Sequence, residues 1–183
     1  PYLPARILSN CILLPIEAES QDTALRIFST LNDRGLPLSD ADIFKAQFYK
    51  YYGTLNKKDE FIAEWKSLEE ITSSVFSPIT GTPMDELFTR YMYFLRAKDG
   101  NKSSTTEALR KFYERNKYQH LKQLNTIDDL KMLALFWKSI VDQDSARFSV
   151  DVLKKLFVLN YAPNGMWQHI TSVYFLQYRE DEG

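Results

Sequence analysis

Residues 22–52 read DTALRIFSTLNDRGLPLSDADIFKAQFYKYY, and this stretch decides the fold that we expect. Apolar residues recur at helical spacing on both sides of Gly35, and glycine commonly ends a helix in a left-handed cap. Pro37 disfavours helix at the residue before it, and Ser39 is a strong N-cap residue with aspartates in the following turn. The stretch therefore predicts two helices joined by a short connector. The second helix is expected to bury Ala41, Phe44, Phe48 and Tyr51.

Three polar side chains flank the buried faces of this helix pair. Asn32, Arg34 and Lys45 lie at the margins of the apolar stripes, where polar groups can line a pocket. A structural interpretation is the alternative: Asn32 and Arg34 would complete a helix end, and Lys45 would extend its amine to water. Convergence of the three side chains on one side of the pair, facing the rest of its domain, would favour the pocket.

The residues around this junction also resemble a known family. Residues 27–45 read IFSTLNDRGLPLSDADIFK, which is similar to the closing helix pair of the ParB-like domain at the N-terminus of GmrSD-type modification-dependent restriction endonucleases. Residues 12–17, ILLPIE, resemble the last strand of that domain. The resemblance covers residues 11–52 and implies a pocket built from the motif residues Asn32, Arg34, Gly35, Ser39, Asp42 and Lys45.

Two motifs of that family do not occur in this sequence. One is the Asp-Gly-Gln-Gln-Arg-like string associated with nucleotide hydrolysis, and the other is the His-Asn-His motif of a downstream nuclease domain. We therefore expect an internal piece of a longer restriction or anti-phage protein. Residues 1–54 would end a ParB-like domain, and residues 55–183 would form a helical middle domain.

The resemblance implies a linking role for the chain. It would connect a nucleotide-hydrolysing domain to a DNA-cleaving or DNA-sensing module, and its partners would be the missing parts of the parent chain. Nucleoside triphosphate, Mg²⁺ and DNA are implied for the parent only. We expect no cofactor and no turnover for the chain alone. The alternative is a non-catalytic helical domain that binds protein partners.

Composition indicates a folded chain of balanced charge. The 183 residues are 44% hydrophobic and 14% aromatic, with 23 basic and 24 acidic residues. This excludes a disordered chain and a whole-chain basic footprint for nucleic acid. No apolar run approaches the ~20 residues of a membrane helix, so we expect no membrane partner. Cys11 is the single cysteine, which suits a reducing compartment, and we expect the cytoplasm.

The whole chain reads as mainly α, a multi-helical bundle of about eight helices with one short N-terminal β-strand. The strand, residues 11–17, lacks obvious sheet partners, so it should pair with a second copy in a homodimer or lie across the first helix pair. The other expected helices span residues 56–76, 84–98, 105–121, 125–141, 149–161 and 167–178.

Specific burial is expected along several of these helices. Thr105 or Thr106 should cap the helix over 105–121, and the adjacent acids at 128–129 should be surface or helix-terminal charges. The cleanest apolar stripe lies in residues 125–141 and includes Val141. The helix over 149–161 is expected to bury Val150, Leu153, Phe157 and Tyr161.

Other candidate chemistry is sparse. His120 and His169 have no partners at metal-ligand spacing, so the sequence predicts no metal site. Residues 110–122, RKFYERNKYQHLK, interleave basic and aromatic residues. The functional interpretation is contact with the DNA backbone, and the alternative is a solvated helix face interrupted by an acid. The candidate phosphate-contacting residues are Arg110, Lys111, Arg115, Lys117 and Lys122.

Overall fold

The computed structural model describes residues 17–20, 23–24, 27, 38–103 and 107–178. The chain divides into two units, Pro1–Leu38 and Ser39–Gly183. In the first unit, Ser20 Oγ accepts a hydrogen bond from the N–H of Thr23 at 3.2 Å, as a helix N-cap does. The expected strand at residues 11–16 and the Gly35 connector lie outside the described residues. Pairing of two copies through that strand stays a prediction.

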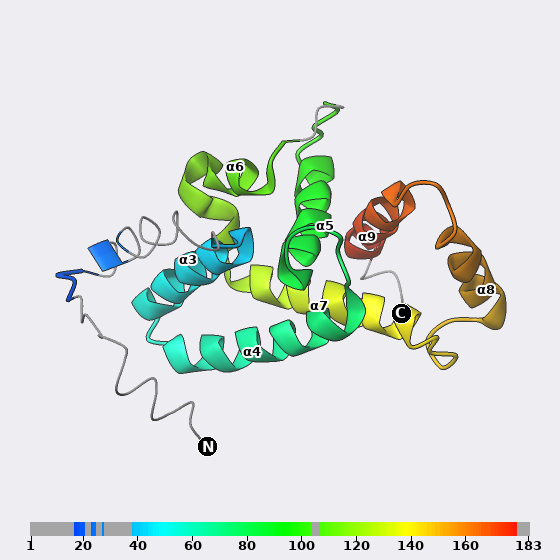
Figure 1. The fold of residues 1–183 in the computed structure, drawn as a ribbon, viewed down its shortest axis with the longest axis horizontal. Helices are drawn as coiled ribbons and strands as arrows, with labels where there is room; N and C mark the ends of the chain where they lie inside the picture. The colour runs from blue at the N-terminus through cyan, green and yellow to red at the C-terminus, as the bar shows by residue number, and fades with distance from the viewer. Residues whose placement is uncertain (1–16, 21–22, 25–26, 28–37, 104–106, 179–183) are drawn as a thin grey trace, which may run out of the picture. The chain divides into compact units, whose positions relative to one another are not determined.

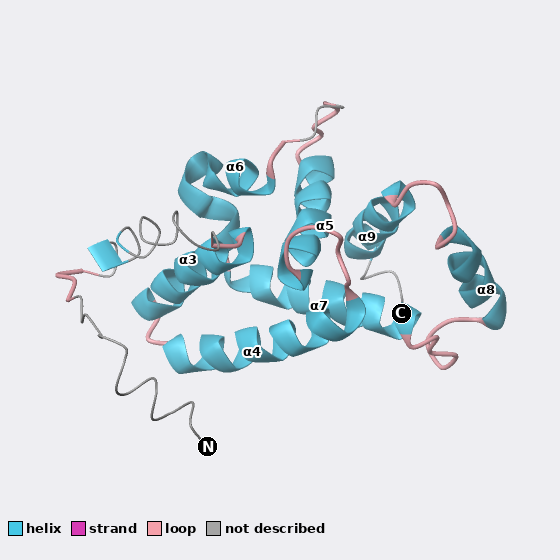
Figure 2. Ribbon diagram, viewed as in Figure 1, coloured by secondary structure: helices cyan, strands magenta, loops and turns pink. Residues whose placement is uncertain are grey.

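The second unit is built from helices and loops, and its described residues contain no strand (Figures 1 and 2). This confirms the predicted mainly α fold. The described helices are α3 (Asp40–Thr54), α4 (Lys58–Val75), α5 (Pro83–Lys98), α6 (Leu109–Glu114), the 3₁₀ helix η1 (Arg115–Leu121), α7 (Leu124–Val141), α8 (Val150–Leu159) and α9 (Met166–Tyr178).

Helix starts follow local capping chemistry. Ser39 caps α3 and Ser149 caps α8, as the sequence predicts. Thr82 caps α5, whose first residue is Pro83. Proline at this position loses no helical hydrogen bond and has the φ that a helix needs. These starts fix the directions of the helices that frame the core.

An aromatic cluster forms the centre of the unit, where α3, α4 and α5 meet. Phe48 of α3 stacks on Phe61 of α4 at 5.8 Å between ring centroids, and Phe44 meets the edge of Phe88 at 4.9 Å. Tyr113 of α6 is completely buried and donates its hydroxyl to the carbonyl of Phe88 at 3.0 Å. Its hydrogen bond satisfies the one polar atom that this ring brings into the core.

A second contact region joins α7 and α9. Phe136 stacks on Phe175 with 4.1 Å between centroids. Trp137 donates its Nε1–H to the hydroxyl of Ser172 at 2.9 Å. Because α9 also packs along α5, these contacts attach the end of the chain to the helical core.

The segment after residue 103 differs from the single long helix that the sequence predicts. The described helix begins at Leu109 behind Ala108, which has no capping side chain, and ends at Glu114. Thr105 and Thr106, the expected capping residues, lie outside the described residues. A 3₁₀ helix follows, in which Lys117 and Tyr118 have φ of 54° and 61°. An α-helix cannot continue through left-handed residues.

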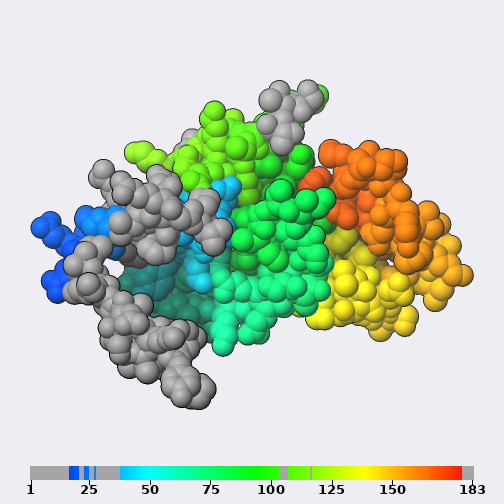
Figure 3. Space-filling view, in the orientation of Figure 1, coloured from blue at the N-terminus to red at the C-terminus, as the bar shows by residue number. Residues whose placement is uncertain are grey.

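Helix α8 also differs from expectation. The sequence predicts burial of Val150, Leu153, Phe157 and Tyr161, yet α8 has no buried residue. Val150 is 61% exposed, Phe157 50% and Tyr161 76%. Among the described helices none packs closely along α8, although Leu156 contacts the core, so periodicity alone overestimated burial. Figure 3 shows α8, in orange, at the surface of the unit.

At two further positions the buried residue is the neighbour of the one that the sequence predicts. Tyr52 is buried where Tyr51 was expected, because its ring lies 5.2 Å from that of Phe61. Val141, the last residue of α7, is exposed because the core ends one residue earlier at Ile140.

Candidate functional site

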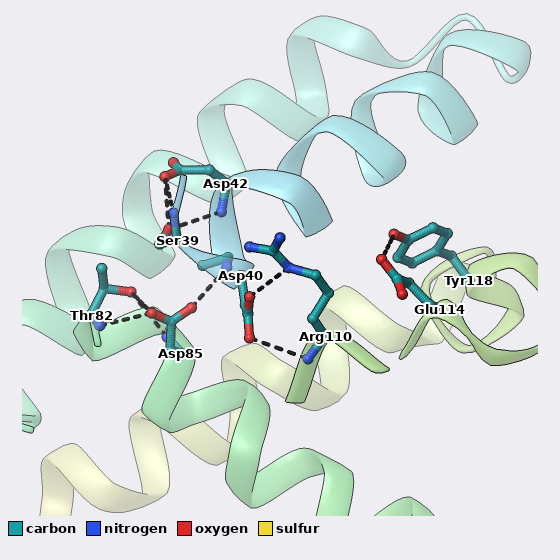
Figure 4. A network of polar contacts seen from close by, with 9 residues as sticks. Ser39, Asp40, Asp42, Thr82, Asp85, Arg110, Glu114 and Tyr118 are labelled. Carbon is teal, nitrogen blue, oxygen red and sulfur yellow. Dashed lines mark hydrogen bonds and ion pairs between the residues drawn. The ribbon is translucent and has the colours of Figure 1, made fainter. Parts of the chain in front are cut away.

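Ser39 and Asp42, at the start of α3, hydrogen-bond to each other in a capping box (Figure 4). The hydroxyl of Ser39 accepts a hydrogen bond from the N–H of Asp42 at 3.1 Å and donates one to its carboxylate at 2.7 Å. The N–H of Ser39 donates to the same carboxylate at 3.1 Å. Two candidate pocket residues are thus engaged in helix capping.

A second capping box ties α5 to α3. One carboxylate oxygen of Asp85 accepts hydrogen bonds from the N–H and hydroxyl of Thr82, at 2.8 and 2.9 Å. The other accepts the N–H of Ala41 in α3 at 2.8 Å. Figure 4 shows Asp85 between the two helix starts. Because carboxylates already occupy the N-terminus of α3, this helix end is poorly suited to a phosphate group.

Asp40 links the same helix start to α6. Its carboxylate accepts the Nε–H of Arg110 at 2.9 Å and the backbone N–H of Arg110 at 3.2 Å. Farther along, the hydroxyl of Tyr118 donates to Glu114 at 3.2 Å. Burial of its ring, followed by the charge of Glu114, raises the pKa of Tyr118 to about 12. Tyr118 is therefore a hydrogen-bond donor at neutral pH.

Lys45 lies between α3 and α4. Its ammonium is 2.9 Å from Glu69 and 5.6 Å from the centre of the Trp65 ring. Trp65 donates its Nε1–H to the same carboxylate at 2.6 Å. Asn32, Arg34 and Gly35 lie outside the described residues. Convergence of Asn32 and Arg34 with Lys45 therefore stays a prediction.

The basic stretch over 110–122 is partly neutralised. Arg110 pairs with Asp40, and Arg115 pairs with Glu107 at 2.6 Å. Lys122 donates to the carbonyl of Lys117 at 2.7 Å. The side chains of Lys111 and Lys117 are exposed. Contact of these five cations with DNA stays a prediction.

A buried arginine joins α5 to α9, and it was not among the residues selected from the sequence. Arg90 is 4% exposed and donates to Glu86 at 3.0 Å and to Gln168 at 2.7 Å. Its guanidinium carbon lies 4.3 Å from the Trp137 ring and 4.7 Å from the Phe76 ring. Burial lowers the pKa of Arg90, and the charge of Glu86 opposes that shift. Arg90 lies among the apolar residues of α5 in sequence, and this position could have indicated that its side chain is buried.

Beside this arginine lies His169. Its ring stacks on Tyr93 with 4.4 Å between centroids. Among the residues that the structure describes, nothing hydrogen-bonds to the buried Nδ1 of His169 or to Nη1 of Arg90. Burial, followed by the positive charge of Arg90, lowers the pKa of His169. The imidazole is therefore neutral at neutral pH.

Asp129 also differs from expectation. The sequence predicts a surface or helix-terminal charge, but the residue is 4% exposed. Tyr91 donates its hydroxyl to the carboxylate at 3.0 Å, and this bond joins α5 to α7. Asp129 precedes Leu133 by four residues and so shares its buried face. The helical spacing could have revealed this position.

The most extensive apolar surface lies on α8 and α9. Among the described residues, more than half of the exposed large hydrophobic side chains fall in this region: Val150, Val152, Phe157, Val158, Leu159, Tyr161, Met166, Ile170, Tyr174 and Tyr178. A groove of about 710 Å³ lies between α5 and α9, and a second of about 470 Å³ lies on the side of α9 that faces α7 and α8. Tyr174 and Tyr178 line both grooves.

Two kinds of feature are absent from the described residues. They contain no group of three or more His, Cys, Asp or Glu side chains placed to hold a metal ion. None of the described helices has the length and apolar character that crossing a bilayer requires.

Comparison with known proteins gives no relative: no family model, curated protein or solved structure matches this chain significantly.

Proposed function

We propose that this chain is a helical protein-interaction module that docks a partner on the face formed by α8 and α9. The exposed apolar side chains gathered there support the proposal. Exposed apolar side chains concentrated in one region in this way are a feature of interaction sites. Helix α8 in particular presents apolar residues that the fold leaves unburied.

The polar contacts of the other helices fit a supporting role. Asp85 joins α3 to α5, Asp40 joins α3 to α6, and Arg90 joins α5 to α9. Such contacts between helices hold their surfaces in fixed positions, which is what a docking face needs. In this proposal Asp40, Asp85 and Arg90 therefore hold the helices in place and do not contact the partner.

Site-specific crosslinking in cells tests the docking face. A photoreactive amino acid is placed at Ile170 in α9 or at Ile62 in α4, both of which are exposed isoleucines. We expect discrete crosslinked products from position 170 and only background from position 62, with the product identified by mass spectrometry. Equal labelling at both positions, or none at position 170, would contradict the proposal.

A restriction protein is the second candidate setting, and the string over 27–45 supports it through its resemblance to GmrSD-type enzymes. In that setting the module would link a nucleotide-hydrolysing domain to a DNA-cleaving or DNA-sensing one. A phage whose DNA carries modified bases should form fewer plaques on cells that carry the gene than the same phage grown without the modification. The chain by itself, given nucleoside triphosphates, Mg²⁺ and modified DNA, should show no turnover above a buffer blank.

A further inference from the structure

The groove between α5 and α9 has an apolar wall with a regular form. Met166, Ile170, Tyr174 and Tyr178 are spaced four residues apart and are exposed. Side chains at this spacing form a ridge along one side of a helix, and the groove beside such a ridge can receive a second helix. Tyr93 of α5 lines the opposite wall. The shape suits an apolar helical face.

The charge around this groove is one-sided. None of the described residues that line it carries a carboxylate, and they include Arg96, which is 8% exposed and donates to the carbonyl of Ser103 at 2.7 Å. Arg96 also lines an adjoining hollow of about 390 Å³, together with Lys111 and Arg115. Among the described residues that line the hollow, Glu107 is the one acid, and it pairs with Arg115. The apolar groove therefore leads into a surface with excess positive charge.

Building on the proposed function, we propose that this groove binds an amphipathic helix of a protein partner that carries acidic side chains beside its apolar face. The apolar face lies along the α9 ridge, and the acids lie near the exposed Lys111. Charge complementarity selects such a partner over a basic peptide.

Two other occupants fit less well. A second copy could offer α8, but Lys155 of that helix pairs with Asp151, which leaves the positive charge of Lys154 and no free acid for a basic hollow. Nucleic acid would meet cations at one end of the groove only and an apolar ridge along the rest, whereas its phosphates are contacted by basic groups along the backbone.

Peptide selection tests the proposal. The purified chain is exposed to a display library of random peptides of about 16 residues, long enough to form four helical turns. Binders are then synthesised and titrated by fluorescence anisotropy at two salt concentrations. We expect enriched peptides with apolar residues at helical spacing and an excess of Asp and Glu. Their affinity should fall as salt rises.

Three variants test the contribution of the apolar ridge, the contribution of the positive charge and an unrelated surface as a control. Ile170→Glu should weaken binding at least about tenfold, since it places a charge on the ridge. Lys111→Glu should weaken binding less and reduce its salt dependence. Ile62→Glu, on α4, should leave binding unchanged.

Enrichment of neutral or basic peptides, no enrichment over a blank surface, or binding unaffected by Ile170→Glu would overturn the proposal. Crosslinking from position 170 in cells, with peptides that lack acids, would refute the acidic partner while leaving the docking face standing. A concentration-dependent dimer abolished by Ile170→Glu would identify a second copy as the occupant instead.

Discussion

The carboxylate of Asp85 accepts the backbone N–H of Ala41 at 2.8 Å, although 44 positions separate the two residues in sequence. The same carboxylate completes the capping box at the start of α5. One side chain therefore satisfies backbone donors at the beginnings of two helices, which otherwise have no partners within their own helix. This contact orients α3 on α5.

Asp85→Ala should lower the free energy of unfolding by about 2–3 kcal/mol, because it removes a cap and an additional charged hydrogen bond between helices. Asp42→Ala is the matched control, since Asp42 completes only the exposed capping box of α3. It should cost about 1 kcal/mol. Urea unfolding followed by circular dichroism measures both, and equal losses would mean that the bond to Ala41 contributes little.

Replacing Arg90 should be strongly destabilising. Arg90→Ala removes the partner of Glu86 and Gln168 in a buried setting, and we expect a loss of about 3 kcal/mol. Arg90→Lys should recover little of this, because an ammonium cannot lie between two rings and bridge both partners as a planar guanidinium does. Lys155→Ala, which removes an exposed ion pair in α8, should change stability by less than about 0.5 kcal/mol. Full rescue by lysine would contradict this role for the guanidinium.

Two phenylalanines distinguish surface from core at the end of the chain. Phe136 is 6% exposed and Phe157 is 50% exposed. Phe136→Ala should lower the free energy of unfolding by about 3–5 kcal/mol through loss of burial and creation of a cavity. Phe157→Ala should lower it by less than about 1 kcal/mol, as surface substitutions do. Chemical denaturation of the two variants checks this, and a large loss for Phe157→Ala would show that α8 belongs to the core.

Acidification should destabilise the fold through His169. Its pKa in the folded protein is lowered from 6.5, mainly by burial and then by the charge of Arg90. The unfolded state therefore binds a proton more readily, and folding stability is lost as the pH falls below about 6.5. Above that pH the imidazole is neutral in both states, and this loss disappears.

The variant His169→Phe isolates that effect, because it keeps an aromatic ring on Tyr93 and removes the titration. We expect the difference in melting temperature between the variant and the original protein to be constant above pH 7 and to move in favour of the variant between pH 6.5 and 5. Parallel melting profiles across that range would show that His169 does not contribute to the acid sensitivity.

The sequence by itself determined the helical fold and several of the residues at which helices begin. Ser39 and Ser149 cap helices where expected, and the apolar residues of α3, α4, α5 and α7 lie on the buried faces that their spacing predicts. These features depend on neighbours within a few turns. A capping hydroxyl acts on the next three residues, and a helical stripe follows from a period of 3.6.

Tertiary structure decided the features that need partners distant in sequence. The helix over 149–161 has an apolar stripe, but burial requires another helix to cover it, and none of the described helices packs closely along it. The reverse holds for Asp129, which was expected at the surface, and for Arg90, a charged residue that is also buried. Rings, amides and a tyrosine hydroxyl from other helices satisfy them inside. Periodicity shows which face of a helix is apolar, but only packing shows which face is covered, because burial is a property of two surfaces.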